Sequence, residues 1–108
     1  MKIHDMSDIR NHYERGEGAR HWFDPSSMRF FRSRLPQTAY TTDDGARSYF
    51  VTSEQFVGSQ GAAPRKFTVR CYTWETRDIS TIGAFNEIAS RSTATAQAKA
   101  LANSEVPA

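Results

Sequence analysis

Two short runs of β-forming residues place arginines between aromatic side chains, and they constrain the fold of this chain more than any other feature. The runs are MRFFRSRL at residues 28–35 and PRKFTVRCYTW at residues 64–74. Alternating side chains of this kind are typical of strands with one face turned to a core and the other to solvent. The runs therefore predict a sheet and, on it, a surface that carries both positive charge and aromatic rings.

Local patterns predict further elements in the first half of the chain. Apolar residues at three- and four-residue steps indicate a helix over residues 1–15, with Asp5 or Ser7 as its N-cap. An Asp-Gly pair within residues 41–45 favours a tight hairpin turn. We expect this hairpin to lead into a strand over residues 47–53, which are rich in β-forming side chains.

The second half of the chain continues the sheet and ends in a helix. Residues 54–64 indicate a flexible connection to a strand over 65–75, which a turn joins to a weaker fourth strand over 79–85. The alanine-rich residues 90–102 predict a helix. Its N-cap is expected at Ser90 or Ser92.

The order of these elements is typical of the α+β class. We expect a small three- to four-stranded antiparallel sheet, with the N-terminal helix and the C-terminal alanine-rich helix packed on one face. A chain of 108 residues has the length of a single domain. We place this domain at residues 21–104, with residues 1–20 as an N-terminal helix or arm and residues 105–108 as a frayed tail.

The apolar content and the single cysteine indicate the cellular compartment of the protein. No apolar run approaches the roughly 20 residues of a membrane span, and no apolar stretch follows the charged start as a signal peptide requires. Cys71 has no second cysteine with which to form an internal disulfide. We expect a soluble protein of a reducing cytoplasm, with no membrane partner.

Arginine dominates the positive charge. The chain carries 14 basic residues against 12 acidic ones, and eleven of the basic residues are arginines. Arginine forms bidentate hydrogen bonds and stacks on rings, so this bias favours a surface that contacts phosphates, carboxylates or aromatic groups. A coding sequence of high GC content would also favour arginine, and both interpretations stay open.

The strand predicted over residues 65–75 divides its side chains between two faces. Alternation assigns an apolar, core-facing set, namely Phe67, Val69, Cys71 and Thr73, and a second set, namely Lys66, Thr68, Arg70, Tyr72 and Trp74. The second set is half polar. Its two large aromatic side chains are expected to be partly exposed.

We expect this second face to join the arginines of the first strand in one cationic binding surface. The predicted binding residues are Arg32, Arg34, Lys66, Arg70, Tyr72 and Trp74. Bases could stack on the aromatics while arginines meet phosphates, which suits nucleic acid. An acidic protein surface suits the same residues, since Tyr, Trp and Arg anchor many interfaces. An ordinary solvated sheet face is the third possibility.

The sequence offers no convincing catalytic or metal-binding arrangement. The histidines His4, His12 and His21 match no ligand spacing, and we interpret them as surface residues. Cys71 lies on the predicted core face, which favours a buried structural thiol over a nucleophile. We therefore expect no cofactor, no metal and no enzymatic activity, although a small enzyme whose site is assembled only in the fold stays an alternative.

Several stretches resemble a group of short proteins encoded by bacteriophages and mobile elements. They are FDPSSMRFFRSRL at residues 23–35, YFVTSEQF at 49–56, PRKFTVR at 64–70 and RDISTIGAF at 77–85, followed by the alanine-rich end. The resemblance implies a small accessory protein acting in a bacterial cytoplasm. It transfers no catalytic residue. Proteins of this kind often bind and block host machinery, including CRISPR effector complexes.

The leading hypothesis from the sequence is therefore a non-enzymatic phage accessory protein that binds a host protein or protein complex as an anti-defence inhibitor. The alternative is a small nucleic-acid-binding module that uses the same cationic, aromatic sheet face. Either a monomer or a homodimer is compatible with the sequence, because an exposed strand edge could pair two copies.

Overall fold

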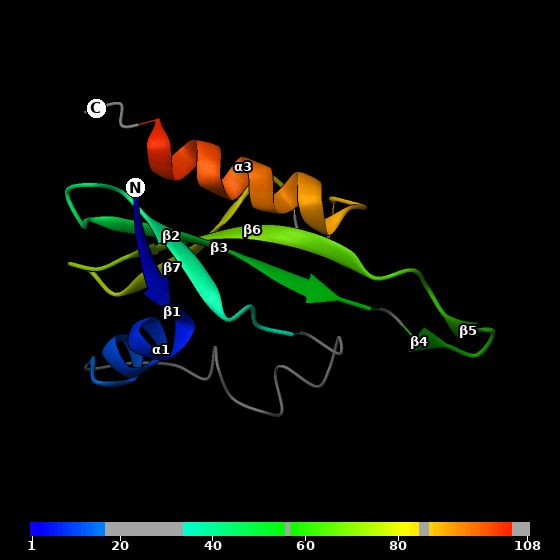
Figure 1. The fold of residues 1–108 in the computed structure, drawn as a ribbon. Helices are drawn as coiled ribbons and strands as arrows, with labels where there is room; N and C mark the ends of the chain where they lie inside the picture. The colour runs from blue at the N-terminus through cyan, green and yellow to red at the C-terminus, as the bar shows by residue number, and fades with distance from the viewer. Residues whose placement is uncertain (17–33, 56, 85–86, 105–108) are drawn as a thin grey trace.

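Five antiparallel strands form the main sheet, in the order β1-β2-β3-β6-β7 (Figure 1). The computed structural model describes residues 1–16, 34–55, 57–84 and 87–104. Its elements, in chain order, are β1 (Lys2–Asp5), α1 (Met6–Glu14), β2 (Thr38–Thr41), β3 (Arg47–Glu54), β4 (Val57–Gly58), β5 (Gly61–Ala62), β6 (Lys66–Thr73), β7 (Asp78–Ile82) and α3 (Arg91–Asn103). The α+β class predicted from the sequence is confirmed.

The centre of the sheet is the long pair β3 and β6, which confirms the strands predicted over residues 47–53 and 65–75. The two strands are in register from Arg47 opposite Thr73 to Glu54 opposite Lys66. The predicted turn before β3 is also present, because Gly45 has a φ of 75° that suits glycine. β7 confirms the fourth strand, although it ends at Ile82.

The N-terminal region differs from the helix predicted over residues 1–15. Its first residues, Lys2–Asp5, form the edge strand β1 and pair with Thr38–Thr41 of β2. Asp5 has extended backbone angles, and its carboxylate accepts a hydrogen bond from the Ser7 backbone N–H at 2.8 Å. The helix therefore begins only after this N-cap, and the sheet has five strands instead of three or four.

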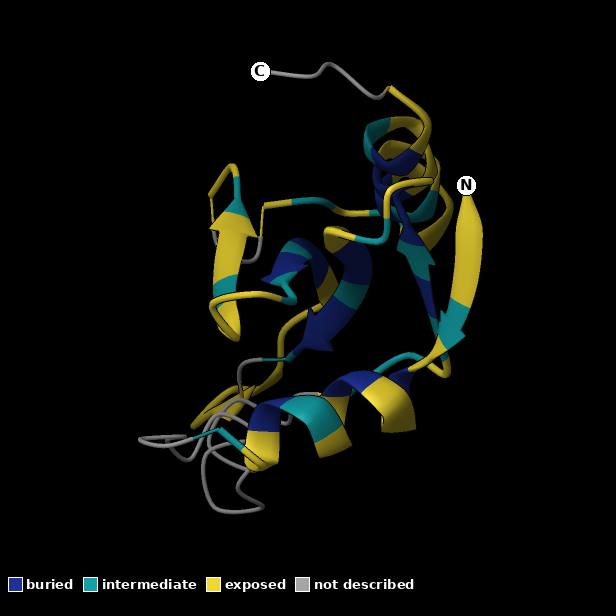
Figure 2. Cartoon of the chain, turned by 90° about the vertical axis from the view of Figure 1, so that its left-hand side faces the viewer, coloured by how far each residue is buried: buried dark blue, intermediate teal, exposed yellow. Residues whose placement is uncertain are grey.

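Residues 54–64 are also more regular than the flexible connection that the sequence indicated. β4 and β5 form a separate two-stranded ribbon, in which Val57 lies opposite Ala62. The ribbon extends beyond the end of the main sheet, and its four residues are exposed (Figures 1 and 2).

The two helices lie on opposite faces of the sheet, so the prediction that both pack on one face is wrong (Figure 1). α3 buries Ala94, Ala98 and Ala102 in a core that also contains Val69 and Cys71. The second core, on the α1 side, comprises Met6, Ile9, Tyr13, Ala39, Phe50 and Tyr72. Neighbouring residues of β3 and β6 are apolar on both faces, so one layer of helices cannot bury them all.

The ends of α3 agree with the alanine-rich helix predicted over residues 90–102. Ser90 is the N-cap, and its hydroxyl accepts a hydrogen bond from the Thr93 backbone N–H. Figure 2 shows the buried side of α3 turned to the sheet and its other side exposed. Neither of the described helices has the length and apolar character needed to cross a bilayer.

Two predicted segments fall largely outside the described residues. Of the strand predicted over 28–35, the structure describes only Arg34 and Leu35. Arg34 forms an isolated bridge with Ser53, with backbone N···O distances of 2.8 and 3.1 Å. The tail predicted over residues 105–108 lies outside the described part entirely.

Candidate functional site

The residues predicted to share one binding surface lie in separate surroundings. Arg32 lies outside the described residues, and Lys66 is exposed at the start of β6. Arg70 belongs to a buried polar network, and Tyr72 and Trp74 belong to an aromatic cluster under α1. Arg34 lines a pocket on the α3 side. The single contiguous surface expected from strand alternation is therefore not formed by the described members of this set.

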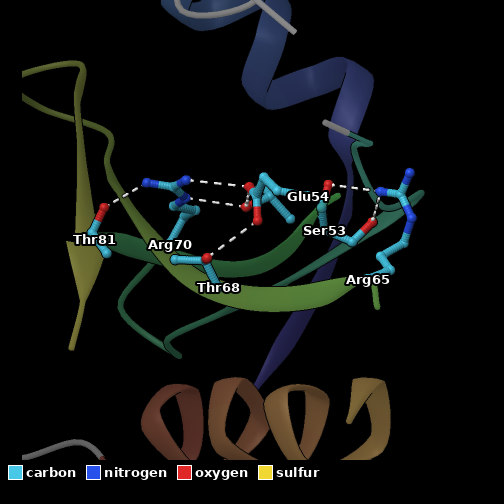
Figure 3. A network of polar contacts seen from close by, with 7 residues as sticks. Ser53, Glu54, Arg65, Thr68, Arg70 and Thr81 are labelled. Carbon is cyan, nitrogen blue, oxygen red and sulfur yellow. Dashed lines mark hydrogen bonds and ion pairs between the residues drawn. The ribbon is translucent and has the colours of Figure 1, made fainter. Parts of the chain in front are cut away.

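Arg70 is held in a polar network around the carboxylate of Glu54, on the sheet face turned away from α3 (Figure 3). The Glu54 side chain is only 1% exposed, and Thr52, Thr68 and Arg70 donate to it at 2.8, 3.3 and 3.4 Å. Arg70 also donates to Thr52 and to Thr81. Burial lowers the pKa of Arg70, and the nearby Glu54 carboxylate opposes that shift. Its role is therefore structural, since a ligand would have to displace these partners.

Tyr72 and Trp74 contribute to the core under α1 and do not form an exposed aromatic platform. Tyr72 is fully buried, and its hydroxyl lies 2.7 Å from Nδ1 of His12. Trp74 Nε1 donates to the Ser48 hydroxyl at 2.7 Å. Burial raises the pKa of Tyr72 to about 12. The predicted partial exposure of Tyr72 is wrong, because the apolar side of α1 packs against this ring and buries it.

The two described histidines are packed against Trp74 and are not simple surface residues. The ring centroids of His4 and His12 lie 5.2 and 4.8 Å from that of Trp74. Burial and the positive charges of Arg77 and Arg15 lower the pKa of His12. His21 lies outside the described residues. Within the described part of the chain, no three His, Cys, Asp or Glu side chains gather as metal ligands.

Cys71 is buried under α3, as the alternation of β6 predicts. Burial raises the pKa of its thiol, which keeps the sulfur protonated and poorly nucleophilic at neutral pH.

A pocket forms on the α3 side where the chain beside β3 bulges away from it. Pairing with β3 holds at Tyr40 opposite Tyr49 and resumes at Arg34 opposite Ser53. Arg34 and Tyr40 are six positions apart in the sequence, whereas their partners Ser53 and Tyr49 are only four apart on β3. Two extra residues between Arg34 and Tyr40 are therefore left out of the ladder. Pro36 lies in this bulge, where its missing N–H does no harm.

The pocket has a volume of about 480 Å³, within the range of about 300–1,000 Å³ typical of ligand sites. The bulge forms one wall, the first turns of α3 form the other, and β3 and β6 form the floor. The described lining residues are Arg34, Leu35, Pro36, Gln37, Thr38, Tyr40, Val51, Ser53, Phe67, Arg91 and Thr95.

The pocket carries positive charge that no described carboxylate neutralises. Arg34 and Arg91 both line it and are exposed, and among the described residues no Asp or Glu lines the pocket or pairs with either guanidinium. Arg65 lies close by, because its guanidinium donates to the backbone oxygen and hydroxyl of Ser53 at 3.0 and 2.9 Å. The first turn of α3 contains no acidic residue, so the helix N-terminus adds to the positive potential.

Apolar and aromatic groups lie beneath these cations. The guanidinium of Arg91 lies 5.5 Å from the centre of the Phe67 ring, and the ammonium of Lys99 lies 5.3 Å from the centre of the Tyr40 ring. Val51 forms part of the floor between the two rings. The arrangement can therefore hold an anionic group at its rim and an apolar group at its floor.

The sequence predicted Arg34 as a binding residue, and it lines the pocket, but no prediction included Arg91 or Tyr40, which line it too. Arg91 reaches the pocket because Phe67 pairs with Ile88, which brings the start of α3 over the end of β6. This pairing joins residues far apart in the chain and leaves no local pattern. The one visible signal was Pro36, which marks the place where the chain leaves the ladder.

The chain belongs to the family of unknown function DUF7447, which it matches over residues 5–99. The match spans the whole of the main sheet after Asp5 and most of α3. No curated protein and no solved structure matches the chain.

Proposed function

We propose that this protein is a non-enzymatic binding protein that docks an acidic protein surface in the pocket between α3 and the bulge. The observation that supports it most is the pair Arg34 and Arg91, whose guanidinium groups line one hollow in which no described carboxylate neutralises them. Some other described arginines contact a carboxylate of the chain, such as Arg10 with Glu14 and Arg70 with Glu54.

Physical chemistry favours a carboxylate as the group bound there. Guanidinium groups form charge-assisted, often bidentate hydrogen bonds with carboxylates, and these are about twice as strong as neutral hydrogen bonds. Val51 on the floor can then contact an apolar side chain of the partner. Arginine and tyrosine, which both line this pocket, are residues that interfaces use as anchors.

Nucleic acid is the second candidate, because arginines and aromatic rings meet in the same pocket. Two observations favour the acidic protein over it. The faces of Phe67 and Tyr40 are already covered by Arg91 and Lys99, so a base could stack on them only by displacing these cations. The pocket also offers few positive charges, whereas the affinity of proteins for nucleic acid comes largely from neutralising phosphates along the backbone.

The narrower proposal is that the partner is a host protein or complex and that the chain is a phage accessory protein which inhibits a bacterial defence system in the cytoplasm. This part rests on the resemblance of residues 23–35, 49–56, 64–70 and 77–85 to short phage proteins. A small binding domain with one charged pocket suits an inhibitor that blocks a surface of a larger complex.

The direct test measures binding of a fluorescently labelled glutamate-rich peptide, with a glutamine-rich peptide and single- and double-stranded oligonucleotides as comparisons. We expect the glutamate-rich peptide alone to bind. The double variant Arg34→Glu/Arg91→Glu should weaken binding about tenfold or more. The matched control Lys2→Glu/Lys66→Glu has the same net charge but changes exposed lysines outside the pocket, and it should bind nearly as the wild type does.

Equal losses in the two double variants would show that net charge, and not the pocket, attracts the peptide. Binding of oligonucleotides alone, with an affinity that falls steeply with salt, would replace the acidic-protein proposal by the nucleic-acid one. For the host partner, affinity capture from bacterial lysate should enrich the same protein with the wild type and the lysine control, and not with the arginine variant.

A further inference from the structure

The spacing of the cations along α3 restricts the kind of acidic segment that fits. Resting on the proposed function, we propose that the pocket binds an extended segment with two acidic side chains four residues apart and an apolar side chain midway between them. The acidic side chains contact Arg91 and Lys99, and the apolar side chain contacts Val51 on the floor.

The first observation is a line of three residues on α3, of which Arg91 and Thr95 line the pocket and Lys99 lies one helical turn further on. Arg91, Thr95 and Lys99 recur every four residues, so they lie on one side of the helix. With a rise of about 1.5 Å per residue, Arg91 and Lys99 are about 12 Å apart along the helix axis. Each cation lies over an aromatic ring of the sheet, Arg91 over Phe67 and Lys99 over Tyr40.

The second observation is that the sheet repeats this spacing. Phe67 lies opposite Ser53 and Tyr40 lies opposite Tyr49, so the two rings flank the ends of a five-residue stretch of β3, whose first and last residues are four positions apart. At about 3.3 Å per residue this stretch is about 13 Å long. Val51 is its middle residue, and its side chain faces the α3 side together with Ser53.

An extended peptide has the same geometry as β3. Side chains two residues apart point to the same side, and positions four residues apart are separated by about 13 Å. Acidic residues at these two positions therefore reach both cations at once. The side chain midway between them points to the same side and meets Val51. Acidic residues two or six residues apart, at about 7 or 20 Å, can reach only one of the two cations.

The two ends of the pocket differ in the number of cations available to an acidic side chain. At the Phe67 end, Arg34 lies opposite Ser53, which is itself opposite Phe67, so a second guanidinium lies on the same face as Arg91. At the Tyr40 end, Lys99 is the cation over the ring. The segment is therefore held most firmly by the acidic residue at the Arg34 and Arg91 end, and the second acidic residue sets the register.

The test uses short labelled peptides of equal length and charge that differ only in spacing. Each contains two glutamates, two, four or six residues apart, in a Gly/Ser background, with one leucine an even number of residues from both, so that it points to the same side as the glutamates. We expect the four-residue spacing to bind about tenfold more tightly than the other two. In the variant Lys99→Glu, this preference should disappear, and a peptide with one glutamate and one lysine at the four-residue spacing should bind better than the one with two glutamates.

The outcomes separate this inference from the proposed function. Equal binding of all three spacings, lost in Arg34→Glu/Arg91→Glu, would overturn the spacing and leave the acidic-protein proposal standing. Absence of binding to every acidic peptide, including the glutamate-rich one, would overturn both. A preference for four-residue spacing that survives in Lys99→Glu would show that another cation sets the register. Circular dichroism of each variant should match the wild type, because the three substituted side chains are exposed.

Discussion

The two faces of the sheet use their arginines in opposite ways. On the α1 face, Arg70 is 12% exposed, and its partners include Glu54, Thr52 and Thr81. On the α3 face, Arg34 and Arg91 line an open pocket in which no described acidic residue meets them. The same residue type thus stabilises the fold on one face and is available to a ligand on the other.

The difference follows from what covers each face. α1 presents Met6, Ile9 and Tyr13, whose bulk fills the space above Phe50 and Tyr72. α3 presents alanines, which bring the helix close to the sheet but fill little volume beside it. The bulge of the neighbouring chain then leaves a pocket at the edge of α3. Charge on a strand is therefore a poor guide to a binding face until the covering helices are known.

The largest expected effect concerns the Glu54 network. Glu54→Ala leaves the guanidinium of Arg70 without its buried carboxylate, and breaking such a pair lowers the free energy of unfolding by about 3–5 kcal/mol. Urea denaturation measures this loss. Glu75→Ala, which removes an exposed glutamate, should change stability by less than about 0.5 kcal/mol. A similar small change in both variants would contradict a structural role for the network.

The second largest effect is expected from alkaline pH, which should lower the free energy of unfolding through the ionisation of Tyr72 on the α1 face. The pKa of Tyr72 is raised to about 12 in the folded protein from an ordinary value of about 10, so folding favours the neutral phenol. The stabilisation is complete below pH 10 and is lost as the pH rises towards 12, by up to about 2.7 kcal/mol. Chemical denaturation at several pH values tests this. The variant Tyr72→Phe should show a shallower decline over that window, and an unchanged slope would count against the shift.

A smaller effect is expected from enlarging the contact between α3 and the sheet. Ala98 is fully buried, so Ala98→Leu forces the helix away and should lower the free energy of unfolding by about 1–3 kcal/mol. Ala96→Leu adds the same volume on the exposed side of α3 and serves as its control. Equal melting temperatures for the two variants would mean that α3 does not pack closely on this face.

The smallest effect on stability is expected in the pocket itself. Arg34→Ala and Arg91→Ala should each change the free energy of unfolding by less than about 0.5 kcal/mol, because neither guanidinium has a described ionic partner. Both should still weaken binding of the glutamate-rich peptide. A large loss of stability in either variant would place that arginine among the structural ones and remove the contrast between the two faces.

The sequence predicted those parts of the fold that depend on local patterns. β3, β6, the turn at Gly45 and the cap of α3 at Ser90 are all encoded within a few neighbouring residues. β1 was missed because Lys2–Asp5 is polar and largely exposed, and becomes a strand only by pairing with the distant β2.

The placement of the helices could not be predicted for a related reason. In β6, Cys71 and Tyr72 are neighbours and therefore point to opposite faces, yet both are buried. Alternation assigns Tyr72 to the second face but does not say whether that face is covered. Only the packing of α1, which is non-local, decides it. For the same reason the sequence placed Arg70 on an open binding surface and gave no sign of its contact with the buried Glu54.

The most direct test of the contrast between the two faces maps the binding of the glutamate-rich peptide by two-dimensional NMR of the backbone amides. We predict that the largest shift changes fall on Arg34, Val51, Ser53, Arg91 and Thr95, which line the pocket. The amides of Thr68, Arg70 and Thr81 should stay nearly unchanged. Changes centred on those three residues, with the pocket unaffected, would contradict the account.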